Sequence, residues 1–410
     1  LFAESPSDVQ ITGKPVPGLE SFDKLMTKFI ADHHAVGAAL AVTRNGRLVY
    51  ARGFGLADKE RHTPVEPTSL FRLASVTKPI TSAAVMHLYE QGKLKLLDHA
   101  FEMVPWNPVA SPGQQSDPRL KQITILELLQ HRGGFNRDIS IDPMFQSVQF
   151  ARLCNDPPPA LQTDIIRVME GRKLDFPPGE RYAYSNFGYC VLGRVIERVS
   201  GQPYEQYVQQ QILAPLGITH MRIGKTHERA PGEVVYYTDK GDTANSVFPP
   251  LNHKVPVPYG AWCIEAMDSH GAWIASAPEI VKFASAFDDP ASSGILSPKT
   301  VAEIFKRPPG LAGLDGGKPG AKPADVWYGC GWQVRDNGDG TFNTWHTGLL
   351  AGTSTLLVRR SDGLDWAVLF NQDSGENGKD YADIIDPLVH QAANAIKAWP
   401  EGKSRDQEWP

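Results

Sequence analysis

β-prone sequence is concentrated near the two ends of this chain, and this distribution constrains the fold more than any single motif does. Near the start, residues 36–43 and 47–54 form two β-prone runs joined at Asn45-Gly46, a dipeptide typical of a tight hairpin. Between the two ends, residues 100–270 alternate helical patterns with Pro-rich loops. After Trp327 come four more β-prone runs, at residues 331–335, 342–346, 353–359 and 366–370.

Helical patterns flank the β-prone runs. Apolar residues at helical spacing predict a helix around residues 22–30, a second over 76–91 that Gly92 ends, and a last one over 384–396. The simplest architecture is of the α+β class: one antiparallel sheet, built from the N- and C-terminal segments, flanked by helices and interrupted by a mostly helical domain.

This architecture predicts three parts with defined boundaries. We expect a sheet domain from residues 20–98 and 271–398, a helical domain from residues 99–270, and a polar tail at residues 399–410. A substrate cleft is expected between the two domains, with walls from loops such as 241–260 and 307–326.

Composition excludes several classes of function. The chain has 41 Lys and Arg against 46 Asp and Glu and no dense basic run, so nucleic acid is not an expected partner. No apolar stretch approaches the roughly 20 residues of a membrane helix, so no integral membrane segment is expected. The four cysteines form no Cys-x-x-Cys pair and no His-Glu-x-x-His is present, so we expect neither a metal nor any other cofactor.

The stretch Ser75-Val76-Thr77-Lys78 begins the helix predicted over residues 76–91. Three residues apart on a helix, Ser75 and Lys78 share one face, so the amine can activate the hydroxyl as a nucleophile. The backbone N–H of Ser75 can also serve a developing oxyanion. Alone, the pattern is more typical of a helix cap followed by a solvated lysine than of a nucleophile and its activator.

Two further stretches have complementary chemistry. In Tyr184-Ser185-Asn186, just before a predicted helix, the phenol can move a proton if nearby cations favour its phenolate, and the amide can orient the nucleophile, the lysine or a substrate carbonyl. The ordinary alternative is a loop that caps the next helix.

The stretch His346-Thr347-Gly348 is predicted to end a strand, where glycine lets a substrate backbone approach the strand edge. The backbone N–H of Leu349 would then be the second oxyanion donor. A strand end with a buried tryptophan is the alternative.

Together these three stretches resemble the Ser-x-x-Lys, Tyr-x-Asn and Lys/His-Thr-Gly motifs of the penicillin-recognising serine hydrolases, over about residues 20–397. That family includes class C β-lactamases, D-alanyl-D-alanine carboxypeptidases, D-aminopeptidases and carboxylesterases of the same fold.

The resemblance implies an acyl-enzyme route. Ser75 is the implied nucleophile, and Lys78 and Tyr184 are jointly the proton-transfer groups. Asn186, His346, Thr347 and Gly348 are implied to bind and orient the substrate, with the Ser75 and Leu349 N–H groups as the oxyanion hole.

Two departures from the family pattern qualify this expectation. The tetrapeptide His131-Arg132-Gly133-Gly134 stands where many relatives have His-Thr-Ser-Gly, so this loop is expected to differ. His346 stands where class C β-lactamases carry lysine, and imidazole is mostly neutral near pH 7. This substitution argues against an efficient β-lactamase.

The leading hypothesis is a serine hydrolase that acts on a small molecule or short peptide, with a D-amino-acid peptide or β-lactam-like carbonyl ahead of a simple ester. The alternatives are a promiscuous carboxylesterase on the same fold and a non-catalytic penicillin-binding sensor or scaffold. The chain begins at Leu1 rather than methionine, so we expect a processed chain, and secretion or a periplasmic location is favoured because the family includes exported enzymes.

Overall fold

A computed structural model describes residues 9–104, 107–109, 113, 115–375, 378–404 and 409. The opening residues 1–8 and parts of the predicted polar tail lie outside the described residues. Within the described part, no helix combines the length and apolar character needed to cross a bilayer.

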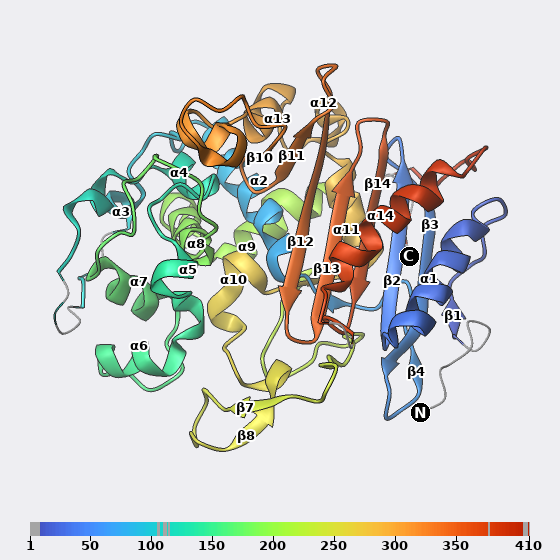
Figure 1. Ribbon diagram of the computed structural model, residues 1–410, viewed down its shortest axis with the longest axis horizontal. Coiled ribbons are helices and arrows are strands. Elements are labelled where there is room, and N and C mark those ends of the chain that lie inside the picture. The colour runs from blue at the N-terminus through green and yellow to red at the C-terminus, as the bar shows by residue number, and fades with distance from the viewer. Residues whose placement is uncertain are drawn as a thin grey trace.

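An antiparallel sheet of nine strands forms the centre of the fold, and it joins the two ends of the chain as predicted (Figure 1). The strands follow the order β1-β3-β2-β14-β13-β12-β11-β10, and β4 pairs with β3. Their bounds are β1 Ile11–Thr12, β2 Gly37–Arg44, β3 Arg47–Asp58, β4 Thr63–Pro64, β10 Val326–Tyr328, β11 Gln333–Asp336, β12 Phe342–Leu350, β13 Thr353–Arg359 and β14 Leu364–Phe370.

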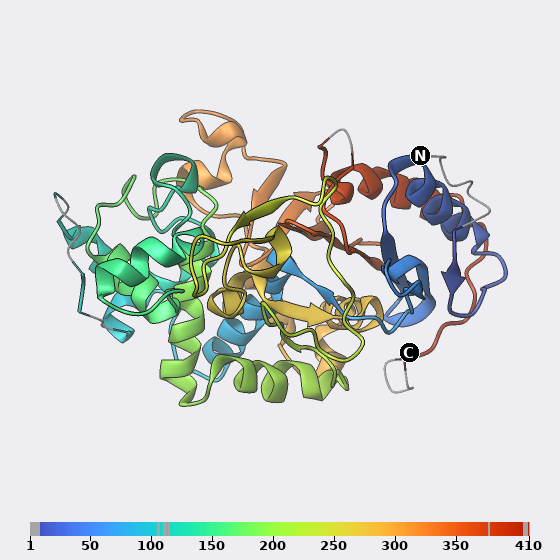
Figure 2. The same cartoon turned by 90° about the horizontal axis from the view of Figure 1, so that it is seen from below.

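The sheet is covered by helices on both faces, which explains why its central strands β13 and β14 are buried at every position. In β14, Trp366, Val368 and Phe370 pack towards α1 (Glu20–His33) and α14 (Tyr381–Asn394). The alternate residues Ala367 and Leu369 pack towards α11 (Ala277–Ser285), and the core cluster to which they belong extends to α2 (Thr77–Glu90). Figure 2 shows α1 in blue and α14 in red together on one side of the sheet. The predicted α+β class is confirmed.

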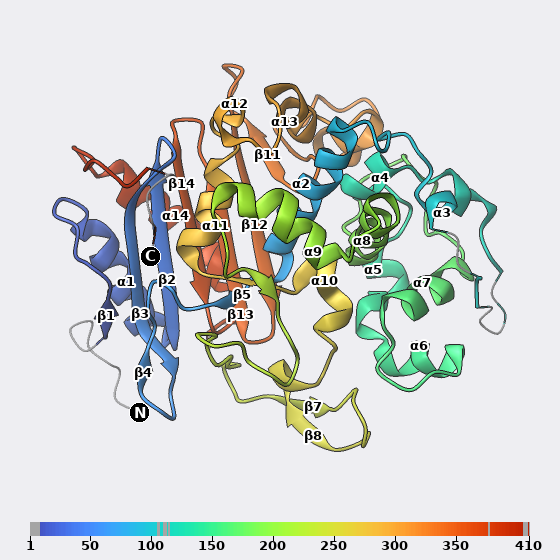
Figure 3. The ribbon, with the colours of Figure 1, turned by 180° about the vertical axis from the view of Figure 1, so that it is seen from behind.

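The segment between β5 (Phe71–Arg72) and β9 (Trp273–Ala275) is mostly helical (Figure 3). Its helices are α3 Ala100–Met103, α4 Ile125–Leu129, α5 Arg137–Ser140, α6 Ser147–Cys154, α7 Gln162–Glu170, α8 Asn186–Ser200, α9 Tyr204–Val208 and α10 Asp268–Gly271, and α2 precedes them. The remaining helices are α12 Pro290–Ser293 and α13 Pro298–Phe305. Strands β5, β9 and β6 (Arg222–Ile223) form a small second sheet.

The two loops expected to form cleft walls have local structure of their own. Residues 241–260 contain a hairpin of β7 (Thr243–Asn245) and β8 (Lys254–Pro256), which projects at the bottom of Figure 1. Residues 307–326 contain two short 3-10 turns, Gly310–Gly313 and Asp315–Gly317.

Candidate active site

Ser75 lies in a 3-10 turn, Ala74–Val76, between β5 and the first turn of α2. Ala74 has a φ of 46°, a left-handed conformation that is uncommon for a residue with a side chain. The turn is held from both sides, since the Leu73 N–H donates to the Trp273 carbonyl at 2.8 Å and the Thr355 hydroxyl donates to the Leu73 carbonyl at 2.8 Å. Strain of this kind persists where the surroundings fix the backbone.

Lys78 is fully buried and has three polar partners. Its Nζ is 2.9 Å from Ser75 Oγ, 2.8 Å from Asn186 Oδ1 and 3.0 Å from the His270 carbonyl oxygen. Burial lowers the pKa of the amine well below its usual value, although Asp142 opposes this shift. A neutral amine has two N–H donors, which can serve Asn186 Oδ1 and the His270 carbonyl oxygen. Its lone pair can then accept the proton of the Ser75 hydroxyl.

Tyr184 approaches the same hydroxyl from the helical segment. Its O–H donates to Ser75 Oγ at 2.7 Å. Burial raises the pKa of the Tyr184 phenol despite the nearby Arg137. A phenolate, as considered from the sequence, would require the opposite, a lowered pKa. Tyr184 is therefore a hydrogen-bond donor near neutral pH.

Asn186 is the first residue of α8 and connects the lysine to a carboxylate that the sequence did not single out. While Asn186 Oδ1 accepts from Lys78, its Nδ2 donates to Asp142 Oδ2 at 2.6 Å. Asp142 also caps a short turn, since its Oδ1 accepts from the Met144 N–H at 3.1 Å. Asp142-Pro143 is recognisable as a turn start, but no sequence pattern indicates its contact with a residue 44 positions away.

The His346 ring is buried, and both of its nitrogens have partners within the protein. Nδ1 donates to the Thr347 carbonyl at 2.6 Å, so Nε2 is the acceptor for the Tyr328 hydroxyl at 2.9 Å. Burial and the neighbouring Lys78 lower the pKa of His346 to about 3. The imidazole is thus neutral at ordinary pH.

Gly348 lies against the turn that carries Ser75. A Cβ at this position would lie 2.3 Å from the Leu73 carbonyl oxygen, 2.3 Å from Thr355 Oγ1 and 3.0 Å from the Ser75 nitrogen. The protein's own backbone and Thr355 therefore approach this glycine closely, and the approach of a substrate stays a prediction. Strand β12 also continues to Leu350 instead of ending at the motif, and it pairs with β11 only from Phe342 to Trp345.

The His131 loop supports the Tyr184 segment from behind. His131 Nδ1 accepts the Ser185 N–H at 3.1 Å, and its ring centroid lies 4.3 Å from that of Tyr184. Burial lowers the pKa of His131 well below its usual value, and Lys78 and His346 add to this shift. A neutral ring here adds no charge beside Lys78.

A short exposed segment follows this loop. Ile139 and Ile141 expose their side chains, and Ile141 has φ 67° and ψ 162°, a region that is largely restricted to glycine. The next residue is Asp142, so the unusual backbone conformation immediately precedes the carboxylate that holds Asn186.

Two pockets lie away from the Ser75 site. They have volumes of about 610 and 620 Å³, and both are lined by Phe287, Phe342, Arg359 and Ser361 but by none of the predicted site residues. The geometry around Ser75, rather than the size of a hollow, identifies the candidate site.

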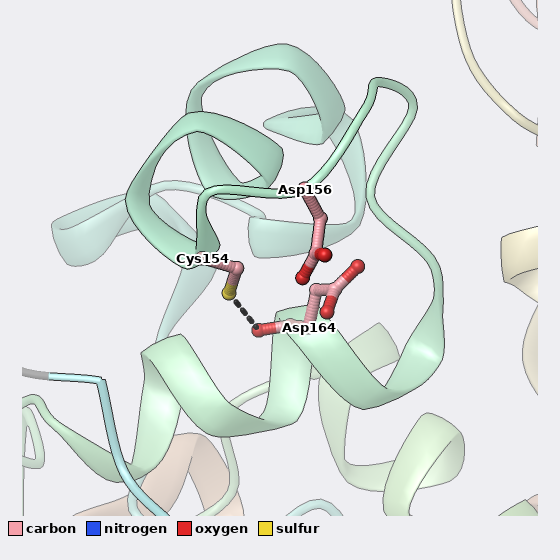
Figure 4. Close-up of side chains that lie close together, drawn as sticks. All are labelled: Cys154, Asp156 and Asp164. Carbon is pink, nitrogen blue, oxygen red and sulfur yellow. Dashed lines mark hydrogen bonds between the residues drawn. The ribbon is translucent and has the colours of Figure 1, made fainter.

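A group of potential metal ligands lies between α6 and α7 (Figure 4). The ligand atoms of Cys154, Asp156 and Asp164 lie within 4.8 Å of one another. Arg167 Nη1, however, is 3.8 Å from each of the two carboxylates, and burial raises the pKa of the Cys154 thiol. These residues form an ion-paired cluster in which the thiolate that a metal prefers is disfavoured.

Comparison with known proteins places this geometry in context. The family model described as Beta-lactamase matches residues 22–389. "Putative penicillin-binding protein PbpX" of Bacillus subtilis (strain 168) is 31% identical over 217 residues, which are 53% of this chain and 49% of that protein. The chain thus matches about half the length of this curated relative.

Two solved structures show the same fold. "EstCE1, a hydrolase with promiscuous acyltransferase activity" superposes with a TM-score of 0.69 at 21% identity, over 93% of this chain and 99% of that one. The D-amino acid amidase from Ochrobactrum anthropi SV3, complexed with L-phenylalanine, superposes with a TM-score of 0.68 at 21% identity, over 93% and 98% of the two chains.

Proposed function

The chain belongs to the Beta-lactamase family of serine hydrolases, and on this premise we propose that it cleaves an amide or ester through an acyl-enzyme on Ser75. The family resemblance drawn from the three sequence motifs is confirmed by the match over residues 22–389. One observation carries the proposal: Ser75 Oγ is hydrogen-bonded both to Lys78 Nζ at 2.9 Å and to the Tyr184 hydroxyl at 2.7 Å.

The lowered pKa of Lys78 supports its role as the base in acylation. Ser75 Oγ forms a bond to the substrate carbonyl carbon while its proton passes to the neutral Lys78 amine. The carbonyl oxygen becomes an oxyanion that accepts from the Ser75 and Leu349 N–H groups. This role for Leu349 remains a prediction.

The raised pKa of Tyr184 supports its role as the acid. When the tetrahedral intermediate collapses, the bond to the leaving nitrogen or oxygen breaks, and Tyr184 donates the proton that the leaving atom needs. The Lys78 ammonium then returns a proton to Tyr184. Water next adds to the acyl-enzyme, loses a proton to Lys78, and releases the acid as Ser75 recovers its hydroxyl.

A D-amino-acid peptide or a β-lactam-like carbonyl is our first substrate class, and the likeness to a D-amino acid amidase supports it. A promiscuous carboxylesterase is the second, supported by the likeness to EstCE1. A sensor that is acylated but does not turn over is the alternative from another class, and the similarity to a putative penicillin-binding protein supports it.

The test is a set of D-alanyl peptides, short p-nitrophenyl esters and β-lactams, each assayed with the wild type and with Ser75→Ala. We expect at least one class to turn over, with a loss of about 10⁴-fold or more in Ser75→Ala. A stable adduct without turnover would favour the sensor. Normal turnover by Ser75→Ala would refute the proposed mechanism.

A further inference from the structure

An exposed cation beside Tyr184 has no role in the mechanism above. Arg137, the first residue of α5, is exposed, and its guanidinium carbon lies 4.8 Å from the ring centroid of Tyr184. Tyr184 in turn contacts Ser75 Oγ. Within the described part of the chain, no ion pair or side-chain hydrogen bond is recorded for Arg137.

The other basic groups beside Ser75 cannot offer a charge to a substrate. Lys78 is buried, with each of its three polar partners supplied by the protein. His346 is neutral, and its acceptor atom Nε2 is already hydrogen-bonded to the Tyr328 hydroxyl. Among these three residues, Arg137 alone is both charged and exposed.

The nearby acidic residues do not neutralise Arg137 through a direct contact. Asp142 directs its carboxylate to the Asn186 amide and the Met144 N–H. Asp138 adjoins Arg137 in sequence, and side chains one residue apart on a helical turn do not face each other. The guanidinium N–H groups of Arg137 are therefore available to bind an external anion.

The position of Arg137 indicates which part of a substrate it would meet. The proposed mechanism gives Tyr184 the task of protonating the leaving atom, so the guanidinium stacked on the Tyr184 ring lies on the leaving-group side. In an amino acid or hydroxy acid, the carboxylate is only two bonds from the amine or hydroxyl that leaves. A carboxylate at that spacing is within reach of an arginine side chain.

We propose that Arg137 binds a carboxylate on the leaving group, so that the enzyme prefers acyl donors that release an amino acid or a hydroxy or thiol acid. The proposal rests on the acyl-enzyme function proposed above. In this chain the substrate carboxylate is thus bound by Arg137 of the helical segment and not by residue 346 of strand β12, which is a neutral histidine.

The test uses two thioesters with the same benzoylglycyl acyl group. One releases thioglycolate, which carries a carboxylate, and the other releases thioglycolamide, which is neutral. Thiol release gives kcat and KM for the wild type, Arg137→Ala, Arg137→Lys and Ser75→Ala. Arg152→Ala is the matched control, because Arg152 is an exposed arginine on α6 and its removal changes the net charge equally.

We expect the wild type to favour the thioglycolate ester, and Arg137→Ala to lower that preference by about 10- to 100-fold through a raised KM. Arg137→Lys should restore part of the preference, and Arg152→Ala should retain all of it. A preference that survives Arg137→Ala would overturn the proposal, and so would an equal loss on both esters, which would mean that Arg137 acts through Tyr184.

The same experiment separates this proposal from the proposed function. Hydrolysis that depends on Ser75 but ignores the leaving-group charge would overturn the role of Arg137 and leave the acyl-enzyme intact. If neither thioester acylated Ser75 although a peptide, ester or β-lactam of the panel above did, the carboxylate site would fail alone. If none of these compounds acylated Ser75, the proposed function would fail with it.

Discussion

Replacing Asp142 by asparagine should change the pH dependence of catalysis more than its maximal rate. Asp142 Oδ2 accepts from Asn186 Nδ2 at 2.6 Å, and Asn186 Oδ1 accepts from Lys78 at 2.8 Å. The carboxylate raises the pKa of Lys78 against the larger effect of burial. Asparagine can still accept the Asn186 hydrogen bond through its one carbonyl oxygen, so the substitution removes the charge together with the acceptor for the Met144 N–H.

The expected size of the effect follows from the length of this chain of contacts. Two hydrogen bonds across one amide separate the two charges by about 7 Å, which at an effective dielectric constant of about 20 gives about 2 kcal/mol, or between one and two pKa units. Without Asp142, the pKa of Lys78 should fall by that amount. Lys78 must be neutral to accept a proton, so the variant should stay active to lower pH.

The assay is the pH profile of kcat/KM, whose acid limb reports the base in the free enzyme. Asp142→Asn should move this limb to lower pH by about one to two units. Asp138→Asn is the matched control, since Asp138 is an exposed aspartate on the same segment, and it should leave the limb in place. An acid limb that does not move in Asp142→Asn would refute the assignment of Lys78 as the base coupled to Asp142.

Two further predictions concern the strand beside Ser75. Gly348→Ala forces a Cβ to within 2.3 Å of the Leu73 carbonyl oxygen and of Thr355 Oγ1, so we expect a loss of about 1–3 kcal/mol of stability and a fall in kcat, measured by urea unfolding and steady-state kinetics; wild-type values for both would contradict the close approach. His346, with a pKa of about 3 when folded, takes up its proton first in the unfolded state, so stability should fall as the pH drops from about 6.5 towards 3. His346→Gln should reduce this slope by up to about 1.4 kcal/mol per pH unit, and an equal slope in both proteins would show that His346 is not buried as a neutral ring.

The parts of the fold that the sequence predicted are those governed by local patterns. The hairpin at Asn45-Gly46, the long strands β13 and β14, and the i, i+3 relation of Ser75 and Lys78 depend on turn chemistry, periodicity and helix geometry. The order of the three motifs was enough to indicate the family, although each motif alone was ambiguous.

The parts that the sequence did not reveal depend on contacts between distant segments. Asp142 reaches Asn186 only because the helical segment folds back on itself. Tyr328 of β10 contacts His346 of β12 only because both strands pair with β11. The sequence suggested a neutral imidazole at His346 from its ordinary pKa, but the Tyr328 contact that occupies its Nε2 required the structure. The position of Arg137 over the Tyr184 ring is likewise a contact between distant segments, so nothing in the sequence distinguished Arg137 from other arginines.

The central claim, an acyl-enzyme on Ser75, is tested most directly by acid-quenching the protein during turnover of a p-nitrophenyl ester and mapping the adduct by peptide mass spectrometry. We predict one acyl group on the peptide that contains Ser75, a matching burst of p-nitrophenol, and the absence of both in Ser75→Ala. An acyl group on another residue, or undiminished turnover by Ser75→Ala, would contradict the account.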